Sequence, residues 1–246
     1  MVMKRFGLIG KPIAHSGSPR LFRAGYHGKY EYDLIEAPDF ETSWKLFLEK
    51  YDGINVTAPY KELAYAKADI VSAECEAIGA ANLLVKTPEG IKAYNSDYSS
   101  IALMLLDALK EKAASTALVV GCGGAGKAAI VAAMEVGLKT SIANRNLTKA
   151  EEFSDHLASV FGKKRKPSVY SLEDMPAADI VIYTLPLAVP GTGRFKDSTV
   201  IEANYRDPVL NPDSGKIWLL GQAVNGYELF TGEKPDAGAM AEALEG

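Results

Sequence analysis

The chain has 246 residues, of which 48% are hydrophobic and 24% charged, and its formal net charge is −4. This length and composition can bury the core of one large or two modest globular domains. The negative charge argues against nucleic acid as the main partner, and no apolar run approaches the roughly 18 residues that span a membrane. With only Cys75 and Cys122 present, and no signal-peptide core behind Met1, we expect a cytoplasmic protein without disulfides.

A first strand is predicted at residues 5–10, followed by a serine-containing loop and a helix with Pro19 in its first turn. Ser18 is placed to cap this helix, and plain capping is one interpretation of it. Ser16 is not needed for capping. Its hydroxyl, together with that of Ser18, is therefore a candidate ligand group. Leu21, Phe22 and Tyr26 should face inward.

Residues 32–37 read as a second strand, and a helix with an apolar face should follow and end near Tyr51. Its large apolar side chains are more typical of a core than of a binding site. They are Phe40, Trp44, Phe47 and Leu48.

Residues 53–61, Gly-Ile-Asn-Val-Thr-Ala-Pro-Tyr-Lys, form the stretch in which we expect the chemistry. Apolar and polar positions alternate as in a strand, so Asn55 and Thr57 share one face. Pro59 stops ladder pairing, and Lys61 stands at the head of a helix. Ligands bind at the carboxyl ends of parallel strands. The alternative, a polar edge strand with a surface lysine, is equally compatible with these nine residues taken alone.

A helix is predicted from Glu62 to about Ile78, and Gly79-Ala80-Ala81-Asn82 ends it. Residues 83–86 and 91–94 should form a hairpin around a Pro-containing turn. Asn95-Ser96-Asp97 then precedes a helix at about 98–112. Alternation of strands and helices indicates an α/β protein.

From Ala117 the sequence reads strand, Gly-Cys-Gly-Gly-Ala-Gly, helix, strand. In this context a G-x-G-x-x-G motif predicts a dinucleotide site, because glycines permit close backbone approach and a helix N-terminus attracts a pyrophosphate. The candidate cofactor residues of this loop are Gly121, Gly123, Gly124, Ala125 and Gly126.

The end of the next strand indicates which dinucleotide is bound. NAD sites usually carry Asp or Glu about 20 residues beyond the glycine loop. Here Asn144, Arg145 and Asn146 occupy that place, with Lys149 one turn later. A guanidinium can bind a 2′-phosphate that a carboxylate would repel, so the residues favour NADP. The basic run at 163–166 reads as a solvated loop.

Two more strands are predicted at residues 178–183 and 199–203, then a helical region at about 220–230 and a helix-prone tail at 236–246. No metal site is predicted.

Seven segments, in this order, resemble the motifs of the shikimate dehydrogenase family over nearly the whole chain. They are His15-Ser16-Gly17-Ser18-Pro19, residues 55–61, Gly79-Ala80-Ala81-Asn82, Asn95-Ser96-Asp97, residues 121–126, Asn144-Arg145-Asn146, and Gly215-x-x-Trp218-Leu219-x-x-Gln222. In the family the last motif usually reads Gly-x-x-Met-Leu-x-x-Gln.

The resemblance implies two α/β domains with a cleft between them. A mixed α/β substrate domain would comprise residues 1–98 and 222–246, and a Rossmann-like NADP domain residues 99–221. It also implies NADPH-dependent reduction of 3-dehydroshikimate to shikimate, in the synthesis of aromatic amino acid precursors. Lys61 would protonate the developing alkoxide, and Asp97 would hold the substrate and the lysine. The substrate-binding residues would be Ser16, Ser18, Asn55, Thr57, Lys61, Asn82, Asp97, Tyr205 and Gln222.

The chain departs from the family pattern in several places. Leu83 and Ser96 replace threonines, so the hydrogen bonds around the acidic group should differ. Glu202 replaces an aspartate. Only nine residues separate Tyr205 from Gly215, which leaves no room for a helix usual in the family.

Two other functions remain open at this level. A quinate/shikimate dehydrogenase would tolerate another ring hydroxyl and accept NAD. A non-catalytic relative would bind dinucleotide or shikimate-type ligands as a sensor. We expect a small-molecule substrate, no membrane partner, and a monomer or homodimer.

Overall fold

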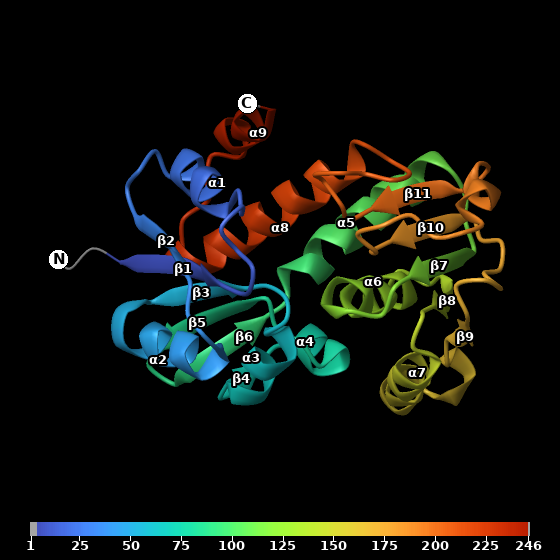
Figure 1. Ribbon diagram of the computed structural model, residues 1–246, viewed down its shortest axis with the longest axis horizontal. Coiled ribbons are helices and arrows are strands. Elements are labelled where there is room, and N and C mark those ends of the chain that lie inside the picture. The colour runs from blue at the N-terminus through green and yellow to red at the C-terminus, as the bar shows by residue number, and fades with distance from the viewer. Residues whose placement is uncertain (1–3, 246) are drawn as a thin grey trace. The chain divides into compact units, whose positions relative to one another are not determined.

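The computed structural model describes residues 4–245, which form two α/β units, each built around its own sheet (Figure 1). The first unit contains the chain up to Ser96 and again from Leu220, and the second contains Asp97–Leu219. Within the described part of the chain, no helix is both long enough and apolar enough to cross a membrane.

The sheet of the first unit has six strands in the order β2-β1-β3-β5-β6-β4. The first three are parallel, whereas β5 runs antiparallel to both β3 and β6, so the sheet is mixed as expected. The bounds are β1 Arg5–Ile9, β2 Glu31–Ile35, β3 Gly53–Val56, β4 Ile70–Val71, β5 Leu83–Thr87 and β6 Gly90–Tyr94. Since β3 lies between β1 and β5, the edge-strand interpretation of residues 53–61 is wrong.

One face of this sheet packs against α2 (Phe40–Lys50). Ile9 of β1 and Ile54 of β3 point into a buried cluster with Trp44 and Phe47 of the helix. The expectation for these side chains is confirmed, with one exception. Leu48 is 46% exposed because it lies at the edge of the buried face of α2.

The opposite face is covered by α1 (Ser18–Gly25) and by the C-terminal part of α8 (Ser214–Thr231). The ring of Phe6 lies 5.4 Å from that of Phe22 in α1 and 5.0 Å from that of Phe230 in α8. Gly53 is required here, because a Cβ would come within 2.7 Å of the Phe230 ring. The segment after Leu220 therefore completes a core begun by the first strands.

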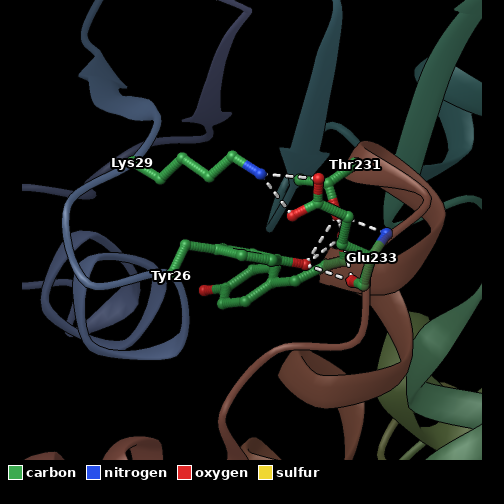
Figure 2. Close-up of polar contacts among 5 residues, drawn as sticks. Tyr26, Lys29, Thr231 and Glu233 are labelled. Atoms are coloured by element: carbon green, nitrogen blue, oxygen red, sulfur yellow. Dashed lines mark hydrogen bonds and ion pairs between the residues drawn. The ribbon is translucent and has the colours of Figure 1, made fainter.

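The chain that leaves α8 is fastened to the end of α1 (Figure 2). The Tyr26 hydroxyl lies 2.8 Å from the Tyr227 carbonyl oxygen, 2.9 Å from that of Glu233 and 2.8 Å from the Thr231 hydroxyl. Burial raises the pKa of Tyr26 to about 12, so it stays a neutral phenol. Lys29 adds an ion pair to Glu233 at 2.6 Å, and α9 (Ala237–Glu245) follows.

The long helix predicted from Glu62 to Ile78 is wrong. The segment forms α3 (Lys61–Lys67), the short strand β4 and α4 (Ala73–Ile78). Asp69 interrupts the helix because its N–H donates to the Ile91 carbonyl and its carboxylate accepts from the Ile91 N–H. Pairing with β6 thus overrides local helix propensity. The β5–β6 hairpin is confirmed, and α5 (Ser96–Glu111) follows it.

The second unit has a five-stranded parallel sheet in the order β11-β10-β7-β8-β9. This is a Rossmann-like arrangement, in which strand order reverses beside the first strand, β7. Its elements are β7 Thr116–Val120, α6 Gly124–Glu135, β8 Lys139–Ala143, α7 Leu147–Phe161, β9 Ser168–Tyr170, β10 Ile180–Tyr183 and β11 Thr199–Glu202, with 3-10 turns at Lys163–Arg165 and Thr192–Phe195.

Asp179 holds the start of β7. Its Oδ2 accepts hydrogen bonds from the N–H of Ser115 at 2.9 Å and from the N–H and hydroxyl of Thr116 at 3.0 and 2.9 Å. The backbone bond from Ser115 is the main reason that the pKa of Asp179 falls from 3.8 to about 2. A depressed carboxyl pKa stabilises the folded state above the unfolded pKa, and this contribution is lost as pH falls through the folded value.

We therefore expect Asp179→Asn to lower Tm at neutral pH. The difference from wild type should shrink as pH falls from about 4 to about 2, because the wild-type carboxylate is then protonated as well. Thermal unfolding followed by circular dichroism at several pH values measures both effects. Asp107→Asn, at an exposed carboxylate that pairs with the surface residue Lys110, is the control. A Tm difference that stays constant down to the lowest pH would contradict the role given to Asp179.

Candidate active site

The two serines before α1 are joined to each other. The Ser16 hydroxyl donates to Ser18 Oγ at 3.0 Å and accepts from the Ser18 N–H at 3.2 Å. Gly17, without a side-chain cap, is the N-cap of α1, and Ser18 is already helical. The capping interpretation of Ser18 is therefore wrong, since its hydroxyl does not bond the end of the helix.

Asn55 projects from β3 toward the sheet face covered by α1 and α8, opposite to buried Ile54 and Val56. The Tyr32 hydroxyl donates to Asn55 Oδ1 at 2.8 Å. A phenol can donate or accept, so the way the carboxamide faces is set by the other partner of the amide, a carbonyl oxygen that can only accept. The amide Nδ2 then lies 3.4 Å from the carbonyl oxygen of Asn82.

Asn82, which is 3% exposed, connects three elements of the first unit. Its Oδ1 accepts from the Ser96 N–H at 2.7 Å and from the Ser96 hydroxyl at 3.3 Å. Its Nδ2 donates to Gln222 Oε1 of α8 at 3.4 Å. The hydroxyl at position 96 is thus directed to Asn82.

Five of the predicted substrate residues therefore lie in two hydrogen-bonded groups, one of serines and one of amides, on a single face of the first sheet, and we call the two groups together the polar network. They are Ser16, Ser18, Asn55, Asn82 and Gln222. Two tyrosines complete this network. Tyr32 bonds Asn55, and Tyr227 donates to the Ser18 carbonyl at 3.2 Å, with the two rings 5.9 Å apart.

The sequence did not single out Tyr32 or Tyr227. Tyr32 lies on the same face as Asn55 because β1 pairs Phe6 with Tyr32 and Leu8 with Asn55, a register that the sequence alone does not give. Burial raises the pKa of both phenols well above their ordinary value, and for Tyr32 the neighbouring Tyr227 adds to the shift. Both remain neutral hydrogen-bond donors at any working pH.

Thr57 and Lys61 lie where β3 passes into α3. The Thr57 N–H donates to Ile9 at 2.9 Å, and the Lys61 carbonyl accepts from Ala81 at 3.0 Å. A Cβ on Gly10 would come within 2.3 Å of the Thr57 methyl group, so this turn is tightly packed. Lys61 is the first residue of α3, as predicted, and its side chain is partly buried.

In the second unit, the glycine loop lies between β7 and α6. Gly121 has φ +106°, which favours glycine, and a Cβ on Gly126 would lie 2.2 Å from the Gly121 carbonyl oxygen. A Cβ on Gly123 would meet nothing within 4 Å. The glycines at 121 and 126 are therefore required by the fold of the loop, whereas Gly123 leaves an open backbone surface at the start of α6. The first N–H groups of a helix attract anions.

Asn144 ties the glycine loop to the start of α7. Its Oδ1 accepts from the Cys122 N–H at 3.3 Å and its Nδ2 donates to the Asn146 carbonyl at 2.8 Å. Asn146 caps α7 by accepting from the Lys149 N–H at 3.0 Å. The side chain of Arg145 is exposed between them. The two asparagines shape the turn that presents this guanidinium.

Glu202 is fully buried at the end of β11, and its carboxylate accepts three consecutive backbone N–H groups, those of Val209 and Leu210 at 2.7 Å and of Asn211 at 2.9 Å. These charge-assisted bonds hold residues 203–213 as a loop leading directly to α8. The described residues contain no helix between Tyr205 and α8, as expected from the short spacing. Tyr205 is partly exposed in this loop, with Arg206 stacked over its ring at 5.5 Å.

Asp97 lies in the first turn of α5 and is 4% exposed. A carboxylate in the first turn of a helix is stabilised by the helix dipole. The structure places Asp97 and Tyr205 in the second unit, and the serine–asparagine network and Lys61 in the first.

Three family models match the chain. Residues 8–84 match the shikimate dehydrogenase substrate binding domain, and residues 219–245 the shikimate 5'-dehydrogenase C-terminal domain. Residues 93–194 match the alanine dehydrogenase/PNT C-terminal domain. The chain is also 39% identical to a shikimate dehydrogenase (NADP(+)) of Maricaulis maris, with 97% of this chain and 94% of that protein aligned. The chain belongs to the shikimate dehydrogenase family.

Solved structures agree with this family membership. The shikimate 5-dehydrogenase of Thermus thermophilus, in complex with NADP(H) and shikimate, matches with a TM-score of 0.82 at 26% identity, over 99% of each chain. Quinate dehydrogenase from Corynebacterium glutamicum, in complex with NAD, matches with a TM-score of 0.85 at 24% identity, over 99% of each chain. The second likeness concerns the fold alone, so the fold does not separate shikimate from quinate enzymes.

The glycine loop provides a matched pair of substitutions. Gly126→Ala should lower Tm, because its Cβ would overlap the backbone at Gly121, and overpacking costs about 1–3 kcal/mol or more. Gly123→Ala should leave Tm nearly unchanged, because that residue has ordinary strand-like dihedrals and open space. Differential scanning calorimetry of both variants measures the contrast. Equal Tm values for the two would contradict the packing assigned to the loop.

Proposed function

We propose that this protein catalyses the NADP-linked interconversion of shikimate and 3-dehydroshikimate, as an enzyme of aromatic precursor synthesis. The observation that carries the proposal is the polar network of serines and asparagines on one face of the first sheet. Neutral hydroxyl and amide groups suit a ring that bears several hydroxyls and a carboxylate. A site that pairs such hydroxyls rejects analogues lacking them, because its own polar groups would be left buried without partners.

Within this network, Ser16 and Ser18 offer two adjacent hydroxyls at the start of a helix, which suits the substrate carboxylate. Asn55, Asn82 and Gln222 offer amides for the ring hydroxyls, with Asn55 oriented by Tyr32. We assign Thr57 and Tyr205 to the substrate as well, on the resemblance of their motifs.

The chemical step requires a hydride and a proton. When bound, the nicotinamide would supply the hydride for reduction of the ring ketone. Lys61, at the head of α3, would donate the proton to the resulting alkoxide oxygen, and Asp97 would hold the substrate hydroxyl and the lysine. General acid catalysis of this kind contributes typically about 10²–10⁴ in rate.

For the cofactor, we propose that the backbone from Gly121 to Gly126 receives the pyrophosphate and that Arg145 binds the 2′-phosphate of NADP. Support comes from the open backbone at Gly123 and from the exposed guanidinium between Asn144 and Asn146, with Lys149 one turn away. The first unit would thus bind the substrate and the second the cofactor.

Cys75 and Cys122 are free and buried, and burial raises the pKa of Cys75 to about 12. Thiols of this kind suit a reducing compartment, so we propose a cytoplasmic enzyme. We also propose that the protein is a monomer or a homodimer.

The direct test measures reduction of NADP⁺ and NAD⁺ with shikimate and with quinate as substrates. The highest kcat/KM is expected for shikimate with NADP⁺. NAD⁺ should be worse by about ten- to a hundredfold, the value of one charge-assisted hydrogen bond of about 1.5–3 kcal/mol. A preference for quinate would identify a quinate-type enzyme. Binding of shikimate or NADPH without any turnover would identify a non-catalytic relative.

Lys61→Ala should lower kcat about 10²–10⁴-fold while the Kd for NADP⁺ stays unchanged, since the cofactor is assigned to the other unit. Lys67→Ala is the matched control, because it makes the same change at the other end of α3, where the side chain pairs with Glu41 at 2.7 Å. Steady-state rates and cofactor fluorescence titration measure the two quantities. Wild-type turnover in Lys61→Ala would remove the lysine from the mechanism.

A further inference from the structure

Trp218 makes a polar contact with Asp97. The indole Nε1–H, near the start of α8, donates to Asp97 Oδ1 at 3.3 Å, a long hydrogen bond. The tryptophan is 2% exposed and the aspartate 4% exposed, so this bond lies out of reach of bulk water. Hydrogen bonds to a charged group in such surroundings are stronger than those at a surface.

A second hydrogen bond joins the start of α8, which carries Trp218, to the start of α5, which carries Asp97. The Ser100 hydroxyl donates to the main-chain carbonyl of Trp218 at 2.9 Å, and it is buried as well. Asp97 and Ser100 are three residues apart on α5, so they lie on the same side of its first turn. The tryptophan therefore contacts this turn through its side chain and through its backbone.

The indole restricts Asp97 in a way that a hydroxyl or an amide side chain would not. It is only a donor, so it can bond the carboxylate but cannot take its proton or exchange roles with it. A carboxyl group is planar, so holding Oδ1 also sets the direction in which Oδ2 points. Burying a carboxylate is costly unless it is hydrogen-bonded, and the N–H meets part of that requirement.

We infer that Trp218 is a positioning residue, which orients the Asp97 carboxylate for the reaction. The inference rests on the proposed function, in which Asp97 touches the substrate and Lys61. It concerns a position at which this chain departs from the motif that it resembles, which usually has methionine, a residue without a side-chain N–H. This chain also has Leu83, without a hydroxyl, where the family has threonine.

The first experiment compares Trp218→Phe with two controls. Trp218→Phe removes the N–H but keeps an aromatic ring and the carbonyl that Ser100 bonds. It should lower kcat about tenfold with the KM for NADP⁺ unchanged, and Trp218→Met should do the same. The first control, Trp44→Phe, makes the same change in α2, where the ring lies in the core of the first unit. The second control, Ser100→Ala, removes the hydrogen bond from α5 to the Trp218 carbonyl. Both controls should keep kcat near the wild-type value.

An equal fall of kcat in Trp218→Phe and Ser100→Ala would mean that the contact is merely structural, and it would overturn the inference. Wild-type kcat in Trp218→Phe would overturn it too.

The second experiment does not depend on activity. In a ¹⁵N-labelled Trp44→Phe protein, Trp218 is the single remaining tryptophan and gives one indole N–H resonance. Adding Asp97→Asn should move this resonance upfield, because a neutral amide accepts more weakly than a carboxylate. Adding Asp107→Asn, at an exposed site, should leave it in place. An unmoved resonance in Asp97→Asn would show that the bond is absent. If the wild-type chain does not oxidise shikimate, the proposed function fails, and this resonance alone decides whether Trp218 holds Asp97.

Discussion

The aromatic packing between the first strand and the last long helix is the constraint on which the substrate-binding unit depends. Phe6 of β1 lies between Phe22 of α1 and Phe230 of α8, and Gly53 leaves room for the Phe230 ring. Aromatic side chains bury about 150–250 Å² each, so this cluster supplies much of the apolar contact on that face of the sheet. Without α8, only α1 would cover this face.

The polar site is built on this packing. Tyr227 and Gln222 belong to the same helix as Phe230, so the rings that seat the helix also place its hydroxyl near Ser18 and its amide near Asn82. The ring of Tyr32 packs at a tilt against that of Phe22, with the centroids 4.8 Å apart, while its hydroxyl orients Asn55. Buried phenols with raised pKa values keep these hydrogen bonds at every ordinary pH. The same packing therefore holds both the apolar core and the residues proposed to bind the substrate.

Short sequence patterns correctly predicted the features that depend on neighbouring residues in the chain. The alternation of Ile54 and Val56 with Asn55 identified a strand with one polar face, and the glycine loop identified the dinucleotide fold. Features that depend on distant segments were missed or wrong. The helix predicted through Asp69 is broken by pairing with Ile91, and Ser18 bonds Ser16 instead of capping α1. The bond from Trp218 to Asp97 joins residues 121 positions apart, so no sequence window contains both.

The first unit is formed by two segments of the chain that are separated by the second unit, and this affects folding during synthesis. Domains generally fold as units while the chain is synthesised from its N-terminus. Here the ribosome finishes the second unit, which ends at Leu219, before it adds the residues that close the first. The strands made earliest must therefore wait, with Phe6 and Phe22 uncovered, until α8 is synthesised. During that interval the nascent chain presents an apolar surface of the kind that chaperones bind, although its second unit is already complete.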